Sequence, residues 1–373
     1  MSVANRVRHI SVGVFALVCL GLEAGQAQSA RRAPKDTAQS AKIAKASKDS
    51  GQVSKFFQTE TPLVATLTTN IGRIRNDKEA DAPWRAATVS YVATSPDTGT
   101  VTVPARIRTR GMWRLKNCLF PPTRLNFTNE AVKGTAFKGL DEPKLVSYCR
   151  NNDEYEQYIL REFQLYRIYQ LLTPASHAVR LLQLTYVDSA SGKKEATRYA
   201  FVVEQPSEMA ERLGAKVLKI KGAGPDDLEP VQSALVGLFQ YMIGNTDFAL
   251  NALHNAELLA TPLGEYVAVV YDFDFSGAVN ARYATTDASL SIKRVRDRLY
   301  RGFCVPNDAY PAAIAKFNAK KDSIYALYSD PIGKLLTPTN VTETLKYFDE
   351  FYRIINDPRS FKREVVDVCL RRR

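Results

Sequence analysis

The stretches GNTDFALNALHN (residues 244–255) and VVYDFDFSG (residues 269–277) place acidic and amide side chains on two loops that follow one another closely in the chain. Asp247 lies just past an apolar helical pattern, whereas Asp272 and Asp274 come at the end of an apolar strand. Carboxylate and amide oxygens that converge from two loops suit a divalent metal and a phosphate. The two stretches therefore predict a joint metal and phosphate site.

Each loop also has a simpler explanation. Asp247 alone would be explained by turn formation, because Asp side chains often bond the backbone of their own turn. Two acids at the end of a buried strand are harder to explain, since an uncompensated carboxylate costs roughly several kcal/mol in a low-dielectric site. Asp272 and Asp274 therefore favour a bound cation. We expect His254 to be a structural polar residue rather than a base.

The N-terminus predicts export. Arg6 and Arg8 precede an apolar run over residues 10–22, and small residues follow up to Ala27, as in a secretory signal peptide. The apolar run is shorter than the ~20 residues that a membrane-spanning helix needs, so cleavage is favoured over an anchor. We expect a signal peptide at 1–27, a disordered Ala, Lys and Ser-rich linker at 28–52, and an exported protein, periplasmic or extracellular, without stable membrane insertion.

Cysteine usage agrees with an oxidising compartment. Removal of the signal peptide leaves Cys118, Cys149, Cys304 and Cys369, an even number that favours two disulfides. Proximity in the sequence suggests the pairs Cys118–Cys149 and Cys304–Cys369. The spacings contain no CxxC motif, which argues against a structural zinc site.

The formal net charge of +12 suggests an anionic partner. Much of that charge lies in the linker and in the C-terminal tail LRRR. No nucleic-acid-binding module is recognised, because basic and aromatic residues are not interleaved on one face. Arg108, Arg110 and Arg124 lie in strand-like segments where they could form a basic floor for phosphates.

Hydrophobic periodicity divides the remaining chain into a sheet-rich part at 53–222 and a mainly helical part at 223–373. The helix at 151–172 has Asn152 or Asp153 as its N-cap, and the apolar helix after Asp226 and Asp227 ends at Gly244. Strands are expected at 61–71, 87–94, 100–111, 123–128, 256–260 and 266–273. The segments 179–188 and 197–205 are expected to form a hairpin, and helices are expected after about residue 300.

The order helix, Asp loop, strand, turn, strand, Asp is that of the catalytic half of protein-kinase-like folds. We therefore expect an α+β, protein-kinase-like two-lobe fold, with a sheet-rich N-terminal lobe and a mainly helical C-terminal lobe.

Over roughly residues 60–285 the chain resembles the CotH-type atypical kinases, a family named for a spore-coat protein. The resemblance lies in the order of the motifs RIRTRGMW (106–113), FPPTRLNF (120–127), YILREFQLYRIYQLL (158–172), FVVEQ (201–205), NTD (245–247), HN (254–255) and VYDFD (270–274). It implies that Asp247 is the catalytic residue and that Asn255 and Asp272 bind metal, with Asp274 as a second acidic candidate. Arg108 and Arg124 would face the phosphates, with Glu204 retained from the family pattern.

The chain differs from that family at three positions. Asn126 stands where the motif has Lys, Arg167 where the helix has Glu, and Gln205 where Glu204 is normally followed by Lys. The Lys and Glu pair that positions phosphates in ordinary kinases is therefore not evident in the sequence.

The predicted function is transfer of a phosphoryl group from a nucleoside triphosphate to a hydroxyl acceptor, with Mg²⁺ or Mn²⁺ as cofactor. A non-catalytic binding module of the cell envelope is the alternative. A DxD phosphatase ranks third, because an apolar strand running into DxDxS would normally open a parallel α/β domain, for which no strands follow. A DxD glycosyltransferase is disfavoured because no alternating strands and helices precede the motif.

Overall fold

The computed structural model describes residues 52–79, 81–93 and 99–371. The predicted signal peptide and nearly all of the predicted linker lie outside these residues.

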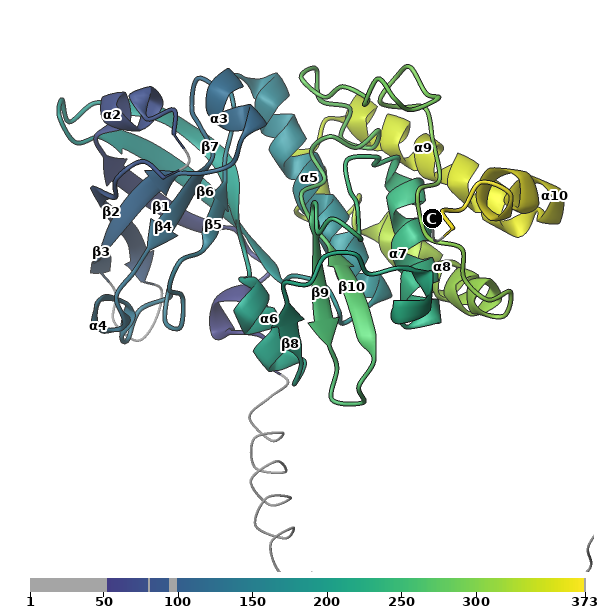
Figure 1. Cartoon of the computed structure of the whole chain (residues 1–373). Coiled ribbons are helices and arrows are strands. Elements are labelled where there is room, and N and C mark those ends of the chain that lie inside the picture. Colours follow the sequence, from purple (N-terminus) through teal and green to yellow (C-terminus); the bar gives the residue numbers. More distant parts are fainter. Residues whose placement is uncertain (1–51, 80, 94–98, 372–373) are drawn as a thin grey trace, which may run out of the picture. The chain divides into compact units, whose positions relative to one another are not determined.

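The first part of the described chain forms a closed barrel of seven strands, in the order β1-β2-β3-β4-β5-β7-β6 (Figure 1). All neighbours pair antiparallel except β1 and β6, which pair in parallel from Leu63 opposite Leu182 to Thr69 opposite Asp188. The strands are β1 (Leu63–Thr69), β2 (Arg85–Ala93), β3 (Gly99–Thr109), β4 (Thr123–Asn126), β5 (Lys144–Val146), β6 (Val179–Asp188) and β7 (Lys194–Val203). Short helices α2 (Ile71–Asn76), α3 (Trp113–Asn117) and α4 (Asn129–Val132) lie between them.

The barrel shows that the expected kinase-like two-lobe fold is wrong. Parallel pairing of β1 with β6 closes the sheet on itself, whereas the prediction assumed a sheet-rich lobe beside a mainly helical one. The predicted strands near 256–260 and 266–273 are present as β9 (Ala256–Ala260) and β10 (Tyr266–Val270), and β8 (Lys216–Leu218) joins them in a three-stranded sheet. The sequence signals were local, and barrel closure depends on a pairing between distant segments.

Alternating side chains fill the barrel. Ala87, Val89 and Tyr91 of β2 are buried at every second position, as the two-residue period of a strand requires. Phe120, Tyr148 and Tyr186 make mutual ring contacts with centroids 5.1–5.3 Å apart within the same core. Aromatic pairs of this kind add to the stabilisation that burial alone provides.

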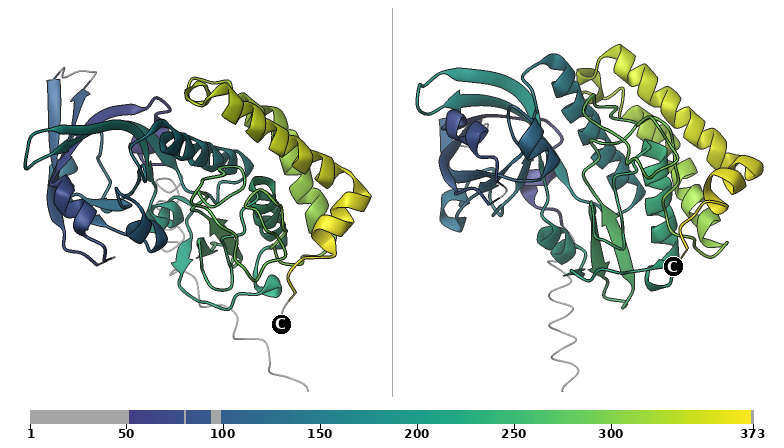
Figure 2. Two further views of the ribbon diagram at one scale, coloured as in Figure 1. Left: turned by 90° about the horizontal axis from the view of Figure 1, so that it is seen from above. Right: turned by 45° about the horizontal axis from the view of Figure 1, so that its top comes forward.

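A second hydrophobic core lies between the barrel and the C-terminal helices. It is built by α5 (Asp153–Leu172), α7 (Pro230–Ile243), α8 (Ala309–Ala326), α9 (Pro338–Asn356) and the small sheet. The helix α5 contacts β7 on one side and α8 on the other. In both views of Figure 2 the C-terminal helices, coloured yellow, lie on the side of α5 away from the barrel. Helices α6 (Pro206–Arg212) and α10 (Pro358–Phe361) are short connections.

The boundaries of the two central helices follow from capping. Asn152 caps α5, as predicted, because its side chain accepts a hydrogen bond from the N–H of Tyr155 at 3.0 Å. The helix α7 begins later than predicted, with Glu229 as N-cap and Pro230 in the first turn. It ends at Gly244, as predicted, in the left-handed conformation with φ of 65°.

Gly244→Ala is expected to lower the free energy of unfolding by about 2 kcal/mol or more. Alanine would have to adopt the left-handed backbone conformation of Gly244, and its Cβ would collide with the hydroxyl of buried Tyr347. Gly192→Ala is the matched control. Its φ of 69° is similar, but nothing lies within 4 Å of the added Cβ, so only the backbone cost of about 1 kcal/mol remains. Urea unfolding of both variants measures the difference. Equal losses in the free energy of unfolding would show that the Tyr347 side chain moves aside without an energetic cost.

Both predicted disulfides are confirmed. Cys118 pairs with Cys149, and Cys304 pairs with Cys369. Among the described residues, no helix combines the length and the apolarity that crossing a bilayer requires. The two disulfides are compatible with an exported protein.

Candidate functional site

Four basic side chains come together from the β3–α3 segment, β4 and β5. Arg110 follows β3 and its Nε donates a hydrogen bond to the carbonyl of Thr123 at 3.2 Å. Arg124 and Lys144 are paired across β4 and β5. Arg110, Arg124 and Lys144 lie close enough for their charges to interact, and Arg114 of α3 interacts with Arg110 in the same way. Like charges gathered in this way are stable only opposite anions.

The matching anions come from α5 and from the segment after β10. Glu162 and Tyr166, one turn apart on α5, hold that segment: the N–H of Asp272 donates to the Tyr166 hydroxyl at 2.9 Å, and the N–H of Phe273 donates to Glu162 Oε1 at 3.4 Å. Asp272 has a φ of 64°, which is uncommon for a residue with a side chain and is found preferentially at functional sites. Asp274 accepts a hydrogen bond from the Tyr283 hydroxyl at 3.0 Å.

Acidic and basic groups face each other directly. Arg114 Nη1 lies 3.8 Å from Asp274 Oδ2, and both side chains are nearly buried. Asp272 also interacts electrostatically with Arg110, Arg114 and Lys144. Two predicted metal ligands, Asp272 and Asp274, therefore do lie beside basic residues.

Crowding of the carboxylates favours their protonated forms. Burial, reinforced by the charge of Asp272, raises the pKa of Asp274 to about 7. Burial also raises the pKa of Glu162 well above its usual range, with Asp274 and Asp272 adding to the effect. Glu162 is only 1% exposed, and its Oε2 has no hydrogen-bond partner. A cation bound beside these carboxylates would favour their ionised forms again.

Asp247 lies at the accessible side of this cluster. Its side chain is 42% exposed, and its charge contributes to raising the pKa of Asp274. His254 Nε2 lies 2.8 Å from Asp247 Oδ1, and Asn255 Nδ2 donates to Asp247 Oδ2 at 3.1 Å and to the Asp247 carbonyl at 2.7 Å. Asn255 therefore orients Asp247 through its amide N–H₂ group. His254, which we expected to be a structural polar residue rather than a base, contacts the same carboxylate.

Lys144 is a basic residue with an unusual titration. Burial, followed by the nearby charge of Arg110, lowers the pKa of Lys144 to about 8, while Asp272 and Glu257 oppose that shift. Its ammonium group also lies 4.2 Å from the centre of the Tyr271 ring. A lysine with this pKa is mostly a cation near neutral pH and becomes neutral in moderate alkali.

Affinity for ATP without metal is therefore expected to fall by up to about tenfold between pH 7.5 and pH 9, because Lys144 loses its charge as the pH rises through its pKa. Isothermal titration calorimetry across this range measures the change. Lys144→Arg is the control, since the guanidinium stays charged and the decline should disappear. A decline that persists unchanged in this variant would contradict the assignment to Lys144.

The other predicted cofactor-binding residues differ in position. Arg124 joins the basic group and also lies 3.3 Å from Glu142. The guanidinium of Arg108 instead packs over the ring of Trp84, 4.4 Å from its centre. Asn126, at the position where the family motif has Lys, accepts hydrogen bonds from Arg106 at 2.6 and 3.0 Å. The structure thus brings Arg124 to the site and uses Arg108 for packing.

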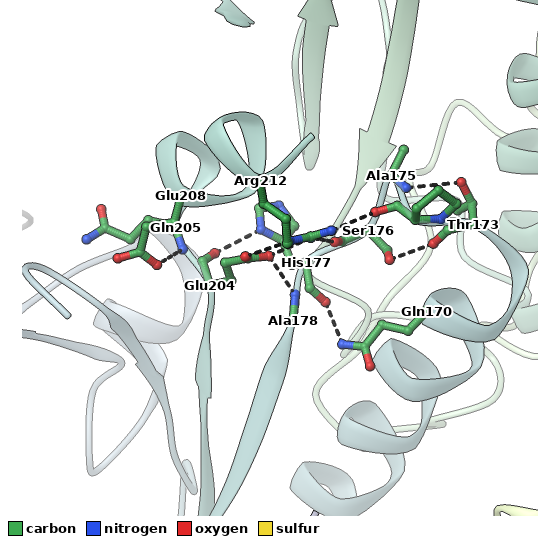
Figure 3. A network of polar contacts seen from close by, with 11 residues as sticks. Gln170, Thr173, Ala175, Ser176, His177, Ala178, Glu204, Gln205, Glu208 and Arg212 are labelled. Atoms are coloured by element: carbon green, nitrogen blue, oxygen red, sulfur yellow. Dashed lines mark hydrogen bonds and ion pairs between the residues drawn. The ribbon is translucent and has the colours of Figure 1, made fainter. Parts of the chain in front are cut away.

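Glu204 belongs to a buried network at the start of α6 (Figure 3). Arg212 donates to its two carboxylate oxygens at 3.0 and 2.8 Å, and the N–H of Ala178 donates to Oε2 at 2.9 Å. The ring of His177 lies against the Glu204 carbonyl, with Nδ1 at 2.8 Å, and burial lowers the pKa of His177 to about 3. Protein donors therefore occupy the Glu204 carboxylate, which gives it a structural role.

Lys144, Glu162 and Arg114 were not among the predicted site residues. Lys144 lies on a strand of three residues, too short to show a two-residue period. Glu162 carried a usable signal, because it interrupts the buried face of α5 between Tyr158 and Tyr166 at helical spacing. Arg114 lies in a five-residue helix that no periodicity marks.

Asp272 and Asp274 are the residues that could hold a magnesium ion together with a phosphate. Within residues 52–79, 81–93 and 99–371, no group of three or more His, Cys, Asp or Glu side chains is arranged to hold a metal on its own. Mg²⁺ does not require such a group, since it commonly uses one or two carboxylates together with substrate phosphates and water. Asp272 and Asp274 supply two carboxylates of the required kind.

Comparison with known proteins does not assign this chain to a family. No protein-family model matches it, and no curated protein matches it significantly. The chemistry of the site is therefore inferred from its own residues.

Proposed function

We propose that this protein transfers a phosphoryl group from a nucleoside triphosphate to a hydroxyl acceptor, with Mg²⁺ or Mn²⁺ as cofactor. One observation carries the proposal: the partly buried Asp272 and the buried Asp274 lie beside Arg110, Arg114 and Lys144, and the half-exposed Asp247 lies within electrostatic reach of Asp274. Phosphoryl transfer depends mainly on positioning and on stabilising charge, and these are the groups that it needs.

The basic residues would bind the phosphates. Arg110, Arg114 and Arg124 offer planar guanidinium donors, which suit the oxygens of a triphosphate. Lys144 adds a point charge. Its ammonium group is already largely removed from water in the folded protein, so the cost of that desolvation is not incurred again on binding. Asp272 and Asp274 would hold the metal ion, which when bound neutralises charge on the phosphate oxygens.

Asp247 would orient the acceptor and accept its proton. The acceptor oxygen forms a bond to the γ-phosphorus, the bond from that phosphorus to the β–γ bridging oxygen breaks, and the nucleoside diphosphate leaves with the electron pair. The hydroxyl proton passes to the Asp247 carboxylate, which His254 and Asn255 hold in position. Because Asp247 is half-exposed, an acceptor can approach it from solvent.

The sequence supports the same activity. The motif order resembles that of the CotH-type kinases, and Asp247, Asn255 and Asp272 are retained. The predicted signal peptide and the two disulfides support a location in the periplasm or outside the cell. We propose that the resemblance to the CotH-type kinases extends to the chemistry of the site and not to the fold.

A non-catalytic binding module is the second candidate. Both carboxylate oxygens of Asp247 already have hydrogen-bonding neighbours, His254 and Asn255, which suits a structural loop as well as a base. In that case the basic and acidic groups would bind a phosphorylated envelope component with a cation and would perform no transfer. Assays of transfer, rather than of binding, distinguish the two candidates.

Thermal denaturation tests binding. ATP with Mg²⁺ at about 100 times its Kd is expected to raise the Tm by about 5 °C, because ligand bound only to the folded state adds to its stability. Asp272→Ala should abolish the Mg²⁺-dependent part of the rise. Asp322→Ala, at an exposed position on α8, should leave it intact. If the natural protein shows no rise, the proposed function is wrong.

A further inference from the structure

The disulfide between Cys118 and Cys149 lies beside two of the basic groups of the site. The helix α3, which carries Arg114, ends at the residue before Cys118. The strand β5, which begins with Lys144, is followed closely by Cys149. The disulfide therefore joins the two segments that deliver Arg114 and Lys144.

Several contacts extend this connection. The N–H groups of Leu119 and Phe120 both donate to the carbonyl of Cys149, at 3.1 and 3.2 Å. Arg114 reaches across to the same segment, where its Nη2 donates to the carbonyl of Ser147. Arg114 Nη1 points at the same time to Asp274. The geometry of Arg114 is thus set by its attachment to the segment that follows β5.

The helix α3 has little stability of its own. It has five residues, well below the length at which an isolated helix is stable in water. Its N-cap has no side-chain hydrogen bond, and Met112 is exposed. The Trp113 ring is 40% exposed but lies 5.5 Å from the ring of Phe275 and 5.3 Å from that of Tyr283. The N–H of Cys118 donates to the carbonyl of Arg114 at 2.9 Å, so the cysteine closes the last turn of this helix. Without the disulfide, α3 would lose its covalent anchor and keep only the contacts of Trp113, Arg114 and Leu115.

We propose that the Cys118–Cys149 disulfide is a positioning bond of the phosphate site, and that this site is complete only after the bond has formed. Oxidation would then couple ligand binding to export, because the bond does not form in a reducing cytoplasm. The ligand, a nucleoside triphosphate, is taken from the proposed function. The positioning itself rests only on the contacts of α3 and of the segment after β5.

The second disulfide provides a matched control. Cys304–Cys369 closes a loop with a sequence separation of 65, against 31 for Cys118–Cys149, so removing it should destabilise the protein at least as much. It joins the chain near residue 304 to the C-terminal segment, where Cys304 and Leu370 share a backbone hydrogen bond. A loss of affinity caused by lower stability alone would therefore affect both variants alike.

The experiment compares C118S/C149S with C304S/C369S in the oxidised full chain without signal peptide. ATP affinity is measured by calorimetry, and mobility is measured by hydrogen–deuterium exchange. C118S/C149S is expected to bind ATP at least tenfold more weakly and to exchange faster over residues 110–120. C304S/C369S should keep the affinity within about twofold, since its bond anchors no residue of the site. Equal affinity in the two variants would overturn the proposal.

Two further arms keep the test decisive. If C118S/C149S does not fold, two glycines inserted between Lys116 and Asn117 keep both disulfides and separate Arg114 from its anchor. This insertion should also weaken ATP binding at least tenfold, and unchanged affinity would contradict the positioning role. If the natural protein does not bind ATP, the proposed function is wrong. If hydrogen–deuterium exchange over residues 110–120 is unchanged in C118S/C149S, the positioning role is wrong.

Discussion

Asp247→Asn is expected to lower the rate of phosphoryl transfer by roughly two to four orders of magnitude, the range that a positioned general base supplies. Affinity for the nucleotide should change by no more than about twofold, because in the proposed function Asp247 would face the acceptor and the basic groups would bind the phosphates. The amide is nearly isosteric and can still accept a hydrogen bond, but it cannot accept the proton. Single-turnover transfer and calorimetric ATP binding measure the two effects separately.

The control for this prediction is Asp322→Asn, which makes the same chemical change at an exposed position on α8. It should leave both quantities unchanged. His254→Asn should reduce transfer less than Asp247→Asn does, since it removes a group that orients the carboxylate and not the carboxylate itself. Parallel losses of transfer and affinity in Asp247→Asn would assign Asp247 to binding. Unchanged transfer would remove it from the chemistry.

Arg212→Met is expected to lower the free energy of unfolding by about 3–5 kcal/mol, because it leaves the Glu204 carboxylate buried without its cation. The side chains of Arg212 and Glu204 are 10% and 2% exposed, so solvent screens the pair little. Arg212 also donates to the carbonyls of Ser176 and Pro174, and those bonds are lost as well (Figure 3). Denaturant unfolding monitored by circular dichroism measures the loss.

Two variants identify the cause of that loss. Arg294→Met removes an arginine whose side chain is 83% exposed and pairs with Asp297, so solvent screens the pair and the stability should change far less than in Arg212→Met. The double variant Arg212→Met with Glu204→Met should recover much of the stability, because no unpaired charge is then left in the interior. A double variant as unstable as the single one would instead attribute the loss to the backbone hydrogen bonds.

The sequence predicted the elements whose signals are local. Asn152 at the start of α5 and Gly244 at the end of α7 are capping residues whose conformations depend on their immediate neighbours. The two disulfides could also be paired from sequence proximity. Barrel closure could not be predicted, since the parallel pairing of β1 with β6 leaves no mark within either strand.

The acidic half of the candidate site was easier to predict than the basic half. Asp272 and Asp274 stand out because charged residues seldom follow an apolar strand without a partner. Lys144 and Arg114 lie in short elements, so their positions depend on strand pairing and on a disulfide. Arg108 and Glu204 matched sequence motifs, yet Trp84 and Arg212 engage their charged groups. A motif gives the residue type, whereas tertiary contacts decide whether the group is free to bind a ligand.

The parallel contact between β1 and β6 also has a consequence for how the chain reaches its native state. A chain that crosses a membrane N-terminus first presents β1, β2 and β3 as an open meander long before residues 182–188 emerge. Until then the backbone groups of β1 on that side have no partner, and unpaired strand edges promote association between chains. Folding of a chain that emerges N-terminus first therefore depends on protecting β1, and its slow step should be the arrival of β6.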